Sequence, residues 1–238
     1  GYLMKNRQPF DLTIVIRAYN LFQIFTCIVF AVYLNFRVGY ETFSSTWKCK
    51  QFEDENFSRE DLIEIFSAQW CFMLFRSTDL LETIFFVLRK KPNQISFLHI
   101  YHHVSTLVVL YLMNRYSASK LLMADNENNC LLTRNALFLG YMDLYIGSLN
   151  NYVHILMYIY YFFSSFKSLR ATTLKFKALM TTIQMTQLVL LFGHCIAAKF
   201  CGESTLFYLL SLNLAILLSL FGKFYYETYL KRKHEKMI

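Results

Sequence analysis

Apolar residues in this chain of 238 residues gather in long runs instead of recurring at the three- and four-residue spacing of a soluble amphipathic helix. A helix needs about 20 mostly apolar residues to cross a bilayer core. Six ranges meet this need: 12–34, 62–88, 95–115, 136–164, 177–199 and 205–227. The composition agrees, since 55% of the residues are hydrophobic. The pattern predicts an all-α polytopic membrane protein in which residues 1–238 form a single integral-membrane domain.

Positive charge is spread unevenly over the segments between these ranges. An even number of crossings places both ends of the chain on one side, and the segments on that side carry most of the 24 Lys and Arg residues. The positive-inside rule predicts that this side is cytosolic. The net charge of +8 therefore falls mainly on the cytosolic face, where it can hold lipid headgroups or an anionic substrate. Nucleic acid is not expected as a partner, because no soluble basic domain is present.

Three histidines stand close together near the start of the third apolar range. At about 100° per residue, His99, His102 and His103 lie within an arc of about 100° on one helix face. Ionisable groups in an apolar span usually face a bundle interior or a wet cavity, so they indicate a functional site. A lone histidine can instead hydrogen-bond across a helix interface. Three on one face favour the functional interpretation.

The second apolar range contains three charged residues at a spacing of three, Arg76, Asp79 and Glu82. Arg76 and Asp79 can pair within a helix. The set is either an internally neutralised stripe or a group that orients the histidines. We favour the second interpretation, because the tight turn at 89–93 brings the third range directly opposite.

The fourth and fifth ranges add further polar positions. A second polar face with its own imidazole lies within an arc of about 80° and consists of Asn151, His154, Tyr158 and Tyr161. Gln184 and Gln187 share one side of the fifth range. His194 lies near the opposite end of that range and is predicted to be structural.

Some segments give weaker signals. Arg17 begins a polar third of the first range and is expected to snorkel to the interface. In the segment 115–135, residues 125–129 are predicted to form a hydrophilic loop and Ser117 to Met123 to be partly helical, and the segment receives no role. Cys27, Cys71 and Cys195 fall in apolar ranges and are expected to be packed thiols. Cys49, Cys130 and Cys201 fall in the far-side loops, where an oxidising lumen would allow a disulfide; a Cys49–Cys201 pair stays open.

The order and spacing of these residues are those of one known family. The set is Arg76-x-x-Asp79-x-x-Glu82-Thr83, Leu88-Arg89-Lys90-Lys91, His99-x-x-His102-His103, Asn151-x-x-His154-x-x-x-Tyr158-x-Tyr160-Tyr161 and Thr182-x-Gln184-x-x-Gln187. It closely resembles the ELO family of very-long-chain fatty acid elongases, and the resemblance covers nearly the whole chain. Arg76, Asp79 and Glu82 stand where that family usually shows Lys, Glu and Asp.

The resemblance implies a fold and an activity. Members of the family are multi-pass enzymes of the endoplasmic reticulum membrane, and they condense an acyl-CoA with malonyl-CoA to give a 3-oxoacyl-CoA, CO2 and CoA. Six of their seven helices form a barrel around a substrate tunnel, so we expect the first helix to be missing here. The expected partners are long-chain acyl-CoA, malonyl-CoA and membrane lipid, with a homodimer and other elongation-cycle enzymes also implied. The C-terminus is expected in the cytosol, and no cofactor or metal is expected.

The resemblance also suggests roles for the site residues. An imidazole can be a nucleophile as well as a base, and His102 is expected to carry the acyl group as an acyl-imidazole. His103 and His154 would move protons or hold the oxyanion, with His99 beside them. The residues expected to orient these histidines are Arg76, Asp79, Glu82, Asn151, Tyr158, Gln184 and Gln187. The candidates for binding CoA phosphates are Lys90, Lys91, Lys175 and Lys177.

Two other functions fit parts of the pattern. His99, His102 and His103 could bind iron, as in membrane desaturases and hydroxylases. Those enzymes have several histidine boxes with eight or more ligands, whereas this chain has six histidines in total. A six-helix transporter would also place polar groups at the midplane. It would show an inverted repeat or a pair of broken helices, and the sequence has neither.

Overall fold

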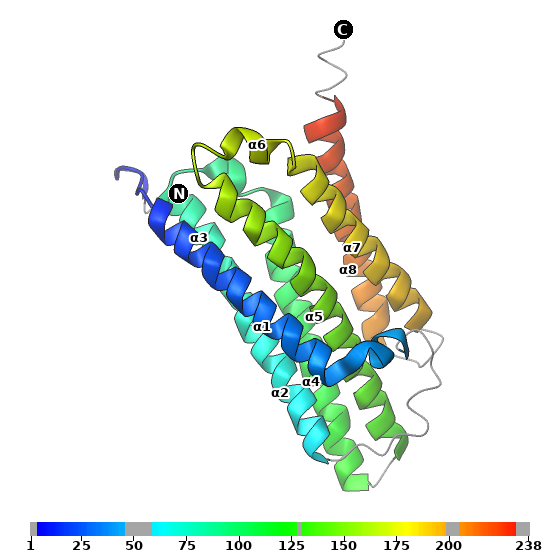
Figure 1. Ribbon diagram of the computed structural model, residues 1–238. Coiled ribbons are helices and arrows are strands. Elements are labelled where there is room, and N and C mark those ends of the chain that lie inside the picture. Colours follow the sequence, from blue (N-terminus) through cyan, green and yellow to red (C-terminus); the bar gives the residue numbers. More distant parts are fainter. Residues whose placement is uncertain (1–3, 46–58, 128–129, 199–204, 232–238) are drawn as a thin grey trace.

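The computed structural model describes residues 4–45, 59–127, 130–198 and 205–231 as a bundle of long helices, with no strand among these residues (Figure 1). Its helices are α1 (Thr13–Ser45), α2 (Arg59–Ser77), α3 (Leu81–Leu88), α4 (Phe97–Glu127), α5 (Cys130–Ser164), α6 (Arg170–Leu174), α7 (Lys177–Ala198) and α8 (Thr205–Tyr225). Short turns at Thr78–Leu80 and Pro92–Gln94 flank α3, and a π-helical turn at Tyr226–Lys231 extends α8. The predicted all-helical fold is confirmed.

The helices follow the predicted apolar ranges with two clear differences. A short turn at Thr78–Leu80 divides the range 62–88 into α2 and α3. The helix predicted in part over 117–123 is complete, and α4 continues to Glu127, so the predicted loop at 125–129 is wrong for residues 125–127, while residues 128–129 lie outside the described residues. Residues 115–127 contain no Gly or Pro, and nothing in their composition ends a helix there.

Three of the helices are long and apolar enough to cross a membrane, over Thr13–Phe36, Lys177–Ala197 and Leu206–Lys231. The other long helices carry most of the charged and polar site residues, which lowers their hydropathy. The structure is thus that of a membrane protein with several apolar helices. The arrangement of six spans as a barrel around a tunnel stays a prediction.

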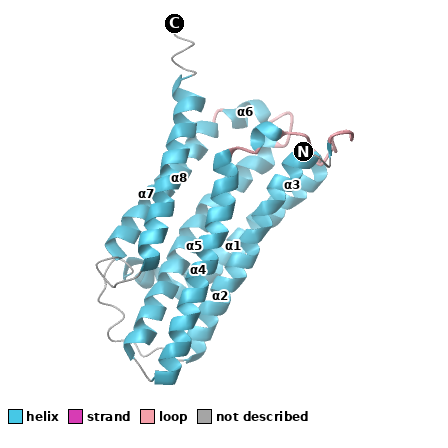
Figure 2. Ribbon diagram, turned by 180° about the vertical axis from the view of Figure 1, so that it is seen from behind, coloured by secondary structure: helices cyan, strands magenta, loops and turns pink. Residues whose placement is uncertain are grey.

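Helix α5 is the element that links the rest of the bundle. It packs against α1, α2, α4 and α7, while α8 packs against α7 and α4 (Figures 1 and 2). The start of α1, the link between α3 and α4, α6 and the end of α8 all lie at one end of the bundle (Figure 1). That arrangement agrees with the predicted even number of crossings. Positive charge at this end includes Lys90, Lys91, Lys175 and Lys177, all of which are exposed.

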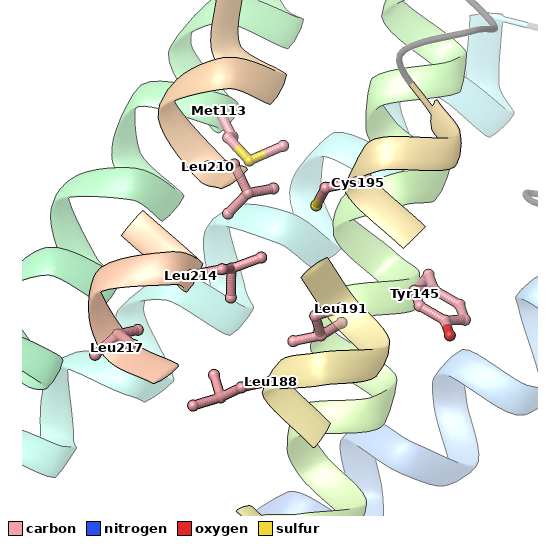
Figure 3. Close-up of a cluster of buried hydrophobic side chains, with 8 residues drawn as sticks. All are labelled: Met113, Tyr145, Leu188, Leu191, Cys195, Leu210, Leu214 and Leu217. Carbon is pink, nitrogen blue, oxygen red and sulfur yellow. The ribbon is translucent and has the colours of Figure 1, made fainter. Parts of the chain in front are cut away.

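The main apolar core joins the α7–α8 pair to α4 and α5. It consists of Met113, Tyr145, Leu188, Leu191, Cys195, Leu210, Leu214 and Leu217 (Figure 3). His194 is fully buried beside this core, where its ring stacks on Tyr145 at a centroid distance of 4.1 Å. This position lies away from the other histidines, as predicted.

Arg17 ties α1 to the segment that follows α5. Its Nε donates to Ser165 Oγ at 3.0 Å, and its Nη2 donates to the Ser165 carbonyl at 3.1 Å. The guanidinium also lies 3.9 Å above the ring of Phe166. The predicted snorkelling thus ends in a defined contact with protein, which includes a cation–π interaction.

The thiols follow the prediction in part. Cys27 and Cys195 are buried, whereas Cys71 is exposed, so the prediction of a packed thiol is wrong there. Cys71 stands on the outward face of α2, a direction that an apolar run does not reveal. Cys49 and Cys201 lie outside the described residues.

A close approach of α2 to α5 generates a stability prediction. A Cβ atom on Gly147 would lie 3.4 Å from the ring of Phe72, whereas one on Gly193 would meet nothing within 4 Å. We expect Gly147→Leu to destabilise the protein by about 1–3 kcal/mol through overpacking. Gly193→Leu is the matched control and should not. Thermal unfolding of the detergent-solubilised chain measures both, and equal melting temperatures would contradict the prediction.

Candidate active site

The three histidines lie in the first two turns of α4. Ser96 begins this helix, since its Oγ accepts from the His99 backbone N–H at 3.1 Å. Lys90 takes a left-handed conformation (φ 51°), which ends α3 and turns the chain back. The His103 ring lies 4.4 Å from that of His99 and 5.4 Å from that of His102, between centroids. The predicted shared face is confirmed.

Asp79 is the centre of a buried polar network. It lies in the turn between α2 and α3 and is 5% exposed. Arg76 Nη1 lies 3.4 Å from Asp79 Oδ2. The other carboxylate oxygen accepts from Gln23 Nε2 at 3.0 Å and from the Tyr158 hydroxyl at 3.1 Å. Three helical segments thus meet at one carboxylate.

Arg76 carries this network across to α5. Its Nη2 donates to Asn151 Oδ1 at 2.6 Å and contacts the Cys27 thiol at 3.5 Å. The guanidinium lies 5.1 Å from the ring centroids of both Phe72 and Phe75. Arg76 therefore has an anion, an amide and two aromatic faces around it, as a buried cation requires.

The contribution of α1 to this network was missing from the sequence prediction. Tyr19 accepts from Gln23 Nε2 at 2.8 Å, and its hydroxyl lies 3.4 Å from that of Tyr158. Tyr19, Gln23 and Cys27 recur at a spacing of four, which places them on one helix face. That spacing was the available signal for a polar face turned inward.

His154 has a defined tautomer. Its Nδ1 lies 2.9 Å from the carbonyl of Asn150, and a carbonyl only accepts, so Nδ1 carries the proton. The lone pair of the neutral ring is then on Nε2, which lies 4.0 Å from Asp79 Oδ2. A base with a carboxylate beside it results, because the carboxylate stabilises the protonated ring.

His102 stands apart from this network. Its Nδ1 is buried with no hydrogen-bond partner among the described residues. A small cavity brings His102 together with His154, and its lining residues are Arg76, Asp79, His102, His103, Thr106, Leu107, Asn150 and His154. Imidazoles of α4 and α5 thus face one space. Thr106 and Leu107 line it one turn beyond the histidine box and were not predicted.

Glu82 and His99 form a second polar group together with His103. Thr83 Oγ1 lies 2.8 Å from His99 Nε2. Glu82, His99 and His103 together offer three potential metal-ligand atoms within 4.8 Å of one another. This is the group in the described part of the chain that could hold a metal ion.

The structure does not join the remaining predicted residues to the network around Asp79. Gln184 contacts the Met157 sulfur at 3.2 Å. Gln187 is buried on α7. The orienting role of both glutamines stays a prediction, as does phosphate binding by the four lysines.

Comparison with known proteins places these residues in a family. The family described as "ELO: GNS1/SUR4 family" matches residues 1–133 and 130–237. The chain belongs to the ELO family. ELO relatives include "Very long chain fatty acid elongase F" of Drosophila simulans, 33% identical over 238 residues, which are 96% of this chain and 81% of the relative. Human "Very long chain fatty acid elongase 1" is 28% identical, and the match covers 97% of this chain and 76% of the relative. "Very long chain fatty acid elongase 4" of Macaca mulatta is 26% identical, and the match covers 98% of this chain and 67% of the relative. The predicted resemblance is confirmed, and the ELO family is one of membrane-bound fatty acid elongases.

The buried pair of Arg76 and Asp79 yields a coupling prediction. Removing one partner leaves an uncompensated buried charge, so we expect Arg76→Met to cost about 3–5 kcal/mol. In the double variant Arg76→Met with Asp79→Asn, the loss of unfolding free energy should be smaller than the sum of the losses in the two single variants by about 0.5–3 kcal/mol. Thermal unfolding in detergent measures the cycle. Arg17→Met is the control for loss of a partly exposed Arg, and additive losses at Arg76 and Asp79 would contradict the prediction.

Proposed function

We propose that this chain is a very-long-chain 3-oxoacyl-CoA synthase, an acyltransferase that condenses a long-chain acyl-CoA with malonyl-CoA. The observation that carries the proposal is the convergence of His102 and His154 on one cavity in a member of the elongase family. Fatty acid elongation requires that a carbon–carbon bond form at a thioester carbon. Two imidazoles suit that chemistry: His102, whose Nδ1 has no hydrogen-bond partner among the described residues, and His154, which has a fixed tautomer.

The first step is acyl transfer to His102. The accessible ring nitrogen attacks the thioester carbon, the carbon–sulfur bond breaks, and CoA leaves as its thiol with the proton that the imidazole gives up. Nδ1 is buried and has no hydrogen-bond partner among the described residues, so the attacking atom in this proposal is Nε2, and Nδ1 carries the proton that the ring gives up. A ring held by hydrogen bonds at both nitrogens would be a poorer nucleophile.

The second step forms the carbon–carbon bond. Malonyl-CoA loses CO2, the electron pair of the broken bond attacks the acyl carbon, and the acyl–imidazole bond breaks. His102 then regains a proton, and the 3-oxoacyl-CoA leaves. His154 Nε2 and His103 face the same cavity, so they can move this proton or stabilise the oxyanion of the tetrahedral intermediate.

The network around Asp79 positions these groups. Asp79 stabilises positive charge on His154, and Arg76 lines the cavity, where its guanidinium can attract the malonyl carboxylate or an oxyanion. Tyr158 and Asn151 hold Asp79 and Arg76 in place.

A second, mainly apolar cavity marks the direction that we propose for the acyl chain; it is small in this structure and must widen to hold the chain. Its lining residues are Phe30, Leu34, Ala68, Gln69, Phe72, Leu110, Asn114, Leu144 and Gly147. Phe72 lies one helical turn before Arg76, and Leu110 is eight residues after His102, about 12 Å along a helix. An acyl chain that extends from His102 toward this cavity would gain about 0.8 kcal/mol per buried CH₂.

The proposal also includes the location and the partners of the enzyme. We place the enzyme in the endoplasmic reticulum membrane with its C-terminus in the cytosol, where acyl-CoA and malonyl-CoA are supplied. A homodimer and other elongation-cycle enzymes are its proposed partners. An iron desaturase or hydroxylase and a transporter are not favoured, because the relatives are named elongases.

Substitution of the two central histidines tests the mechanism. His154→Asn should lower the elongation rate about 10²- to 10⁴-fold, as loss of a general acid–base does. It should still gain the mass of one acyl group when incubated with acyl-CoA alone, whereas His102→Asn should gain none. Intact-protein mass spectrometry and incorporation of labelled malonyl-CoA are the measurements. His194→Asn is the control, and an acyl adduct in His102→Asn would refute the nucleophile assignment.

Substitution of the exposed lysines at the proposed cytosolic end tests CoA binding. An exposed ion pair contributes up to about 1 kcal/mol, so Lys175→Gln should raise the KM for malonyl-CoA up to about fivefold with kcat unchanged. Higher salt should reduce the difference from wild type through screening. Lys223→Gln, an exposed lysine at the end of α8, is the control. An unchanged KM in the combined Lys90, Lys91, Lys175 and Lys177 variant would exclude these residues as the phosphate site.

A further inference from the structure

Glu82, His99 and His103 lie together where α3 faces the start of α4. Each offers one ligand atom, and the three atoms lie within 4.8 Å of one another. All three side chains are half-buried, so an ion from solution can reach them. Two imidazole nitrogens and a carboxylate oxygen form a set that binds Zn²⁺ in proteins.

The charge around Glu82 favours a cation. Glu82 forms no ion pair within the described ranges of the chain, whereas Arg76 pairs with Asp79 and donates to Asn151. Asp79 lies one turn before Glu82 and adds a second carboxylate to the same short segment. A carboxylate inside a membrane bundle needs a proton or a cation partner. A metal ion between Glu82 and the two imidazoles would supply it.

His99 already has the outer contact that metal-bound histidines usually make. Its Nε2 lies 2.8 Å from Thr83 Oγ1. When Nε2 carries the proton and donates to this hydroxyl, the lone pair is on Nδ1, which can coordinate a metal. Such an outer partner fixes the tautomer and orientation of a ligating ring. The tilted ring of Phe86 adds a second contact, with its centroid 5.3 Å from that of His99.

The geometry is suited to a tetrahedral ion with three protein ligands. Zn–N and Zn–O bonds of about 2.0–2.2 Å require ligand atoms roughly 3.4 Å apart, so small side-chain rotations close the observed spacing. His₂Glu sets keep a fourth position open for water or another ligand. His103 also lines the cavity of His102 and His154, so the ion would stand at the edge of that cavity.

We propose that Glu82, His99 and His103 form a Zn²⁺ site whose occupation inhibits the enzyme. Zn²⁺ takes the lone pair of His103 and places a positive charge beside the cavity. The binding site itself is independent of the proposed function, whereas the inhibition rests on it. Removal of Zn²⁺ restores the free imidazole and with it the condensation reaction.

Direct binding measurements test the site. The purified, tag-free chain in detergent, stripped with EDTA, should bind one equivalent of Zn²⁺ in competition with a chromophoric chelator. Thr83→Val should weaken binding about 10- to 100-fold as the loss of an outer partner. Glu82→Gln and His99→Gln should weaken it further. Co²⁺ in place of Zn²⁺ should give the visible absorption of a four-coordinate site in the wild type.

A matched control separates metal binding from catalysis. His154→Asn removes a histidine outside the cluster, so it should bind Zn²⁺ as the wild type does although it elongates poorly. Less than one equivalent of Zn²⁺ on the wild type, or equal affinities for wild type, Glu82→Gln and His99→Gln, would overturn the site. These outcomes do not depend on any activity assay.

Elongation in buffered free Zn²⁺ tests the inhibition. The wild-type rate should fall as the site fills and recover with EDTA, and Thr83→Val should need about 10- to 100-fold more Zn²⁺ for the same loss. Full activity with the site filled would overturn the inhibitory role. If a metal-free wild type shows no elongation while Zn²⁺ still binds, the proposed function fails and the metal site stands.

Discussion

The rest of the site depends on the buried interaction of Arg76 with Asp79. Neither side chain is stable alone inside an apolar bundle, so each must be matched by opposite charge and hydrogen bonds. The matching groups come from other helices: Gln23 from α1, and Tyr158 and Asn151 from α5. Because both ions demand partners, their burial fixes how α1, α2 and α5 approach one another. The electrostatic requirement thus becomes a geometric constraint on the bundle.

Polar groups in this site differ in how completely they are held. Asp79 has partners on both carboxylate oxygens, provided by Arg76, Gln23 and Tyr158. Arg76 Nε and His102 Nδ1, by contrast, are buried with no hydrogen-bond partner among the described residues, and both side chains line the same cavity. An unsatisfied buried polar group costs about 1–3 kcal/mol, which natural proteins tolerate mainly where the group has a function. The contrast supports a division between the carboxylate that holds the site and the side chains at the cavity that meet the substrate.

The sequence predicted the elements and the chemical groups better than their partners. Apolar runs revealed the helices, and the spacing of His99, His102 and His103 revealed their common face, because both depend on local periodicity. The pairing of Gln23 with Asp79 joins residues 56 positions apart, and no local pattern encodes it. The last turn of α4, residues 125–127, was predicted as a loop for a related reason, since its polar residues suggest a loop although the absence of Gly or Pro allows a helix. For Gln184 and Gln187, a shared helix face indicates a common direction but not a partner, and their orienting role stays a prediction.

The two imidazoles that meet in the cavity differ because their helices place them differently. His154 lies within α5 after Asn150, whose carbonyl is available to the ring Nδ1 and so sets the tautomer. His102 lies near the start of α4, one residue before His103, and it lines the cavity together with Asp79 and Arg76, although no described residue forms a hydrogen bond with its Nδ1. A proton carrier benefits from a fixed tautomer and a nearby anion, whereas a nucleophile benefits from a lone pair that no donor occupies. The same pair of adjacent helices therefore supplies both requirements, because Asp79 and the Asn150 carbonyl lie beside the His154 ring.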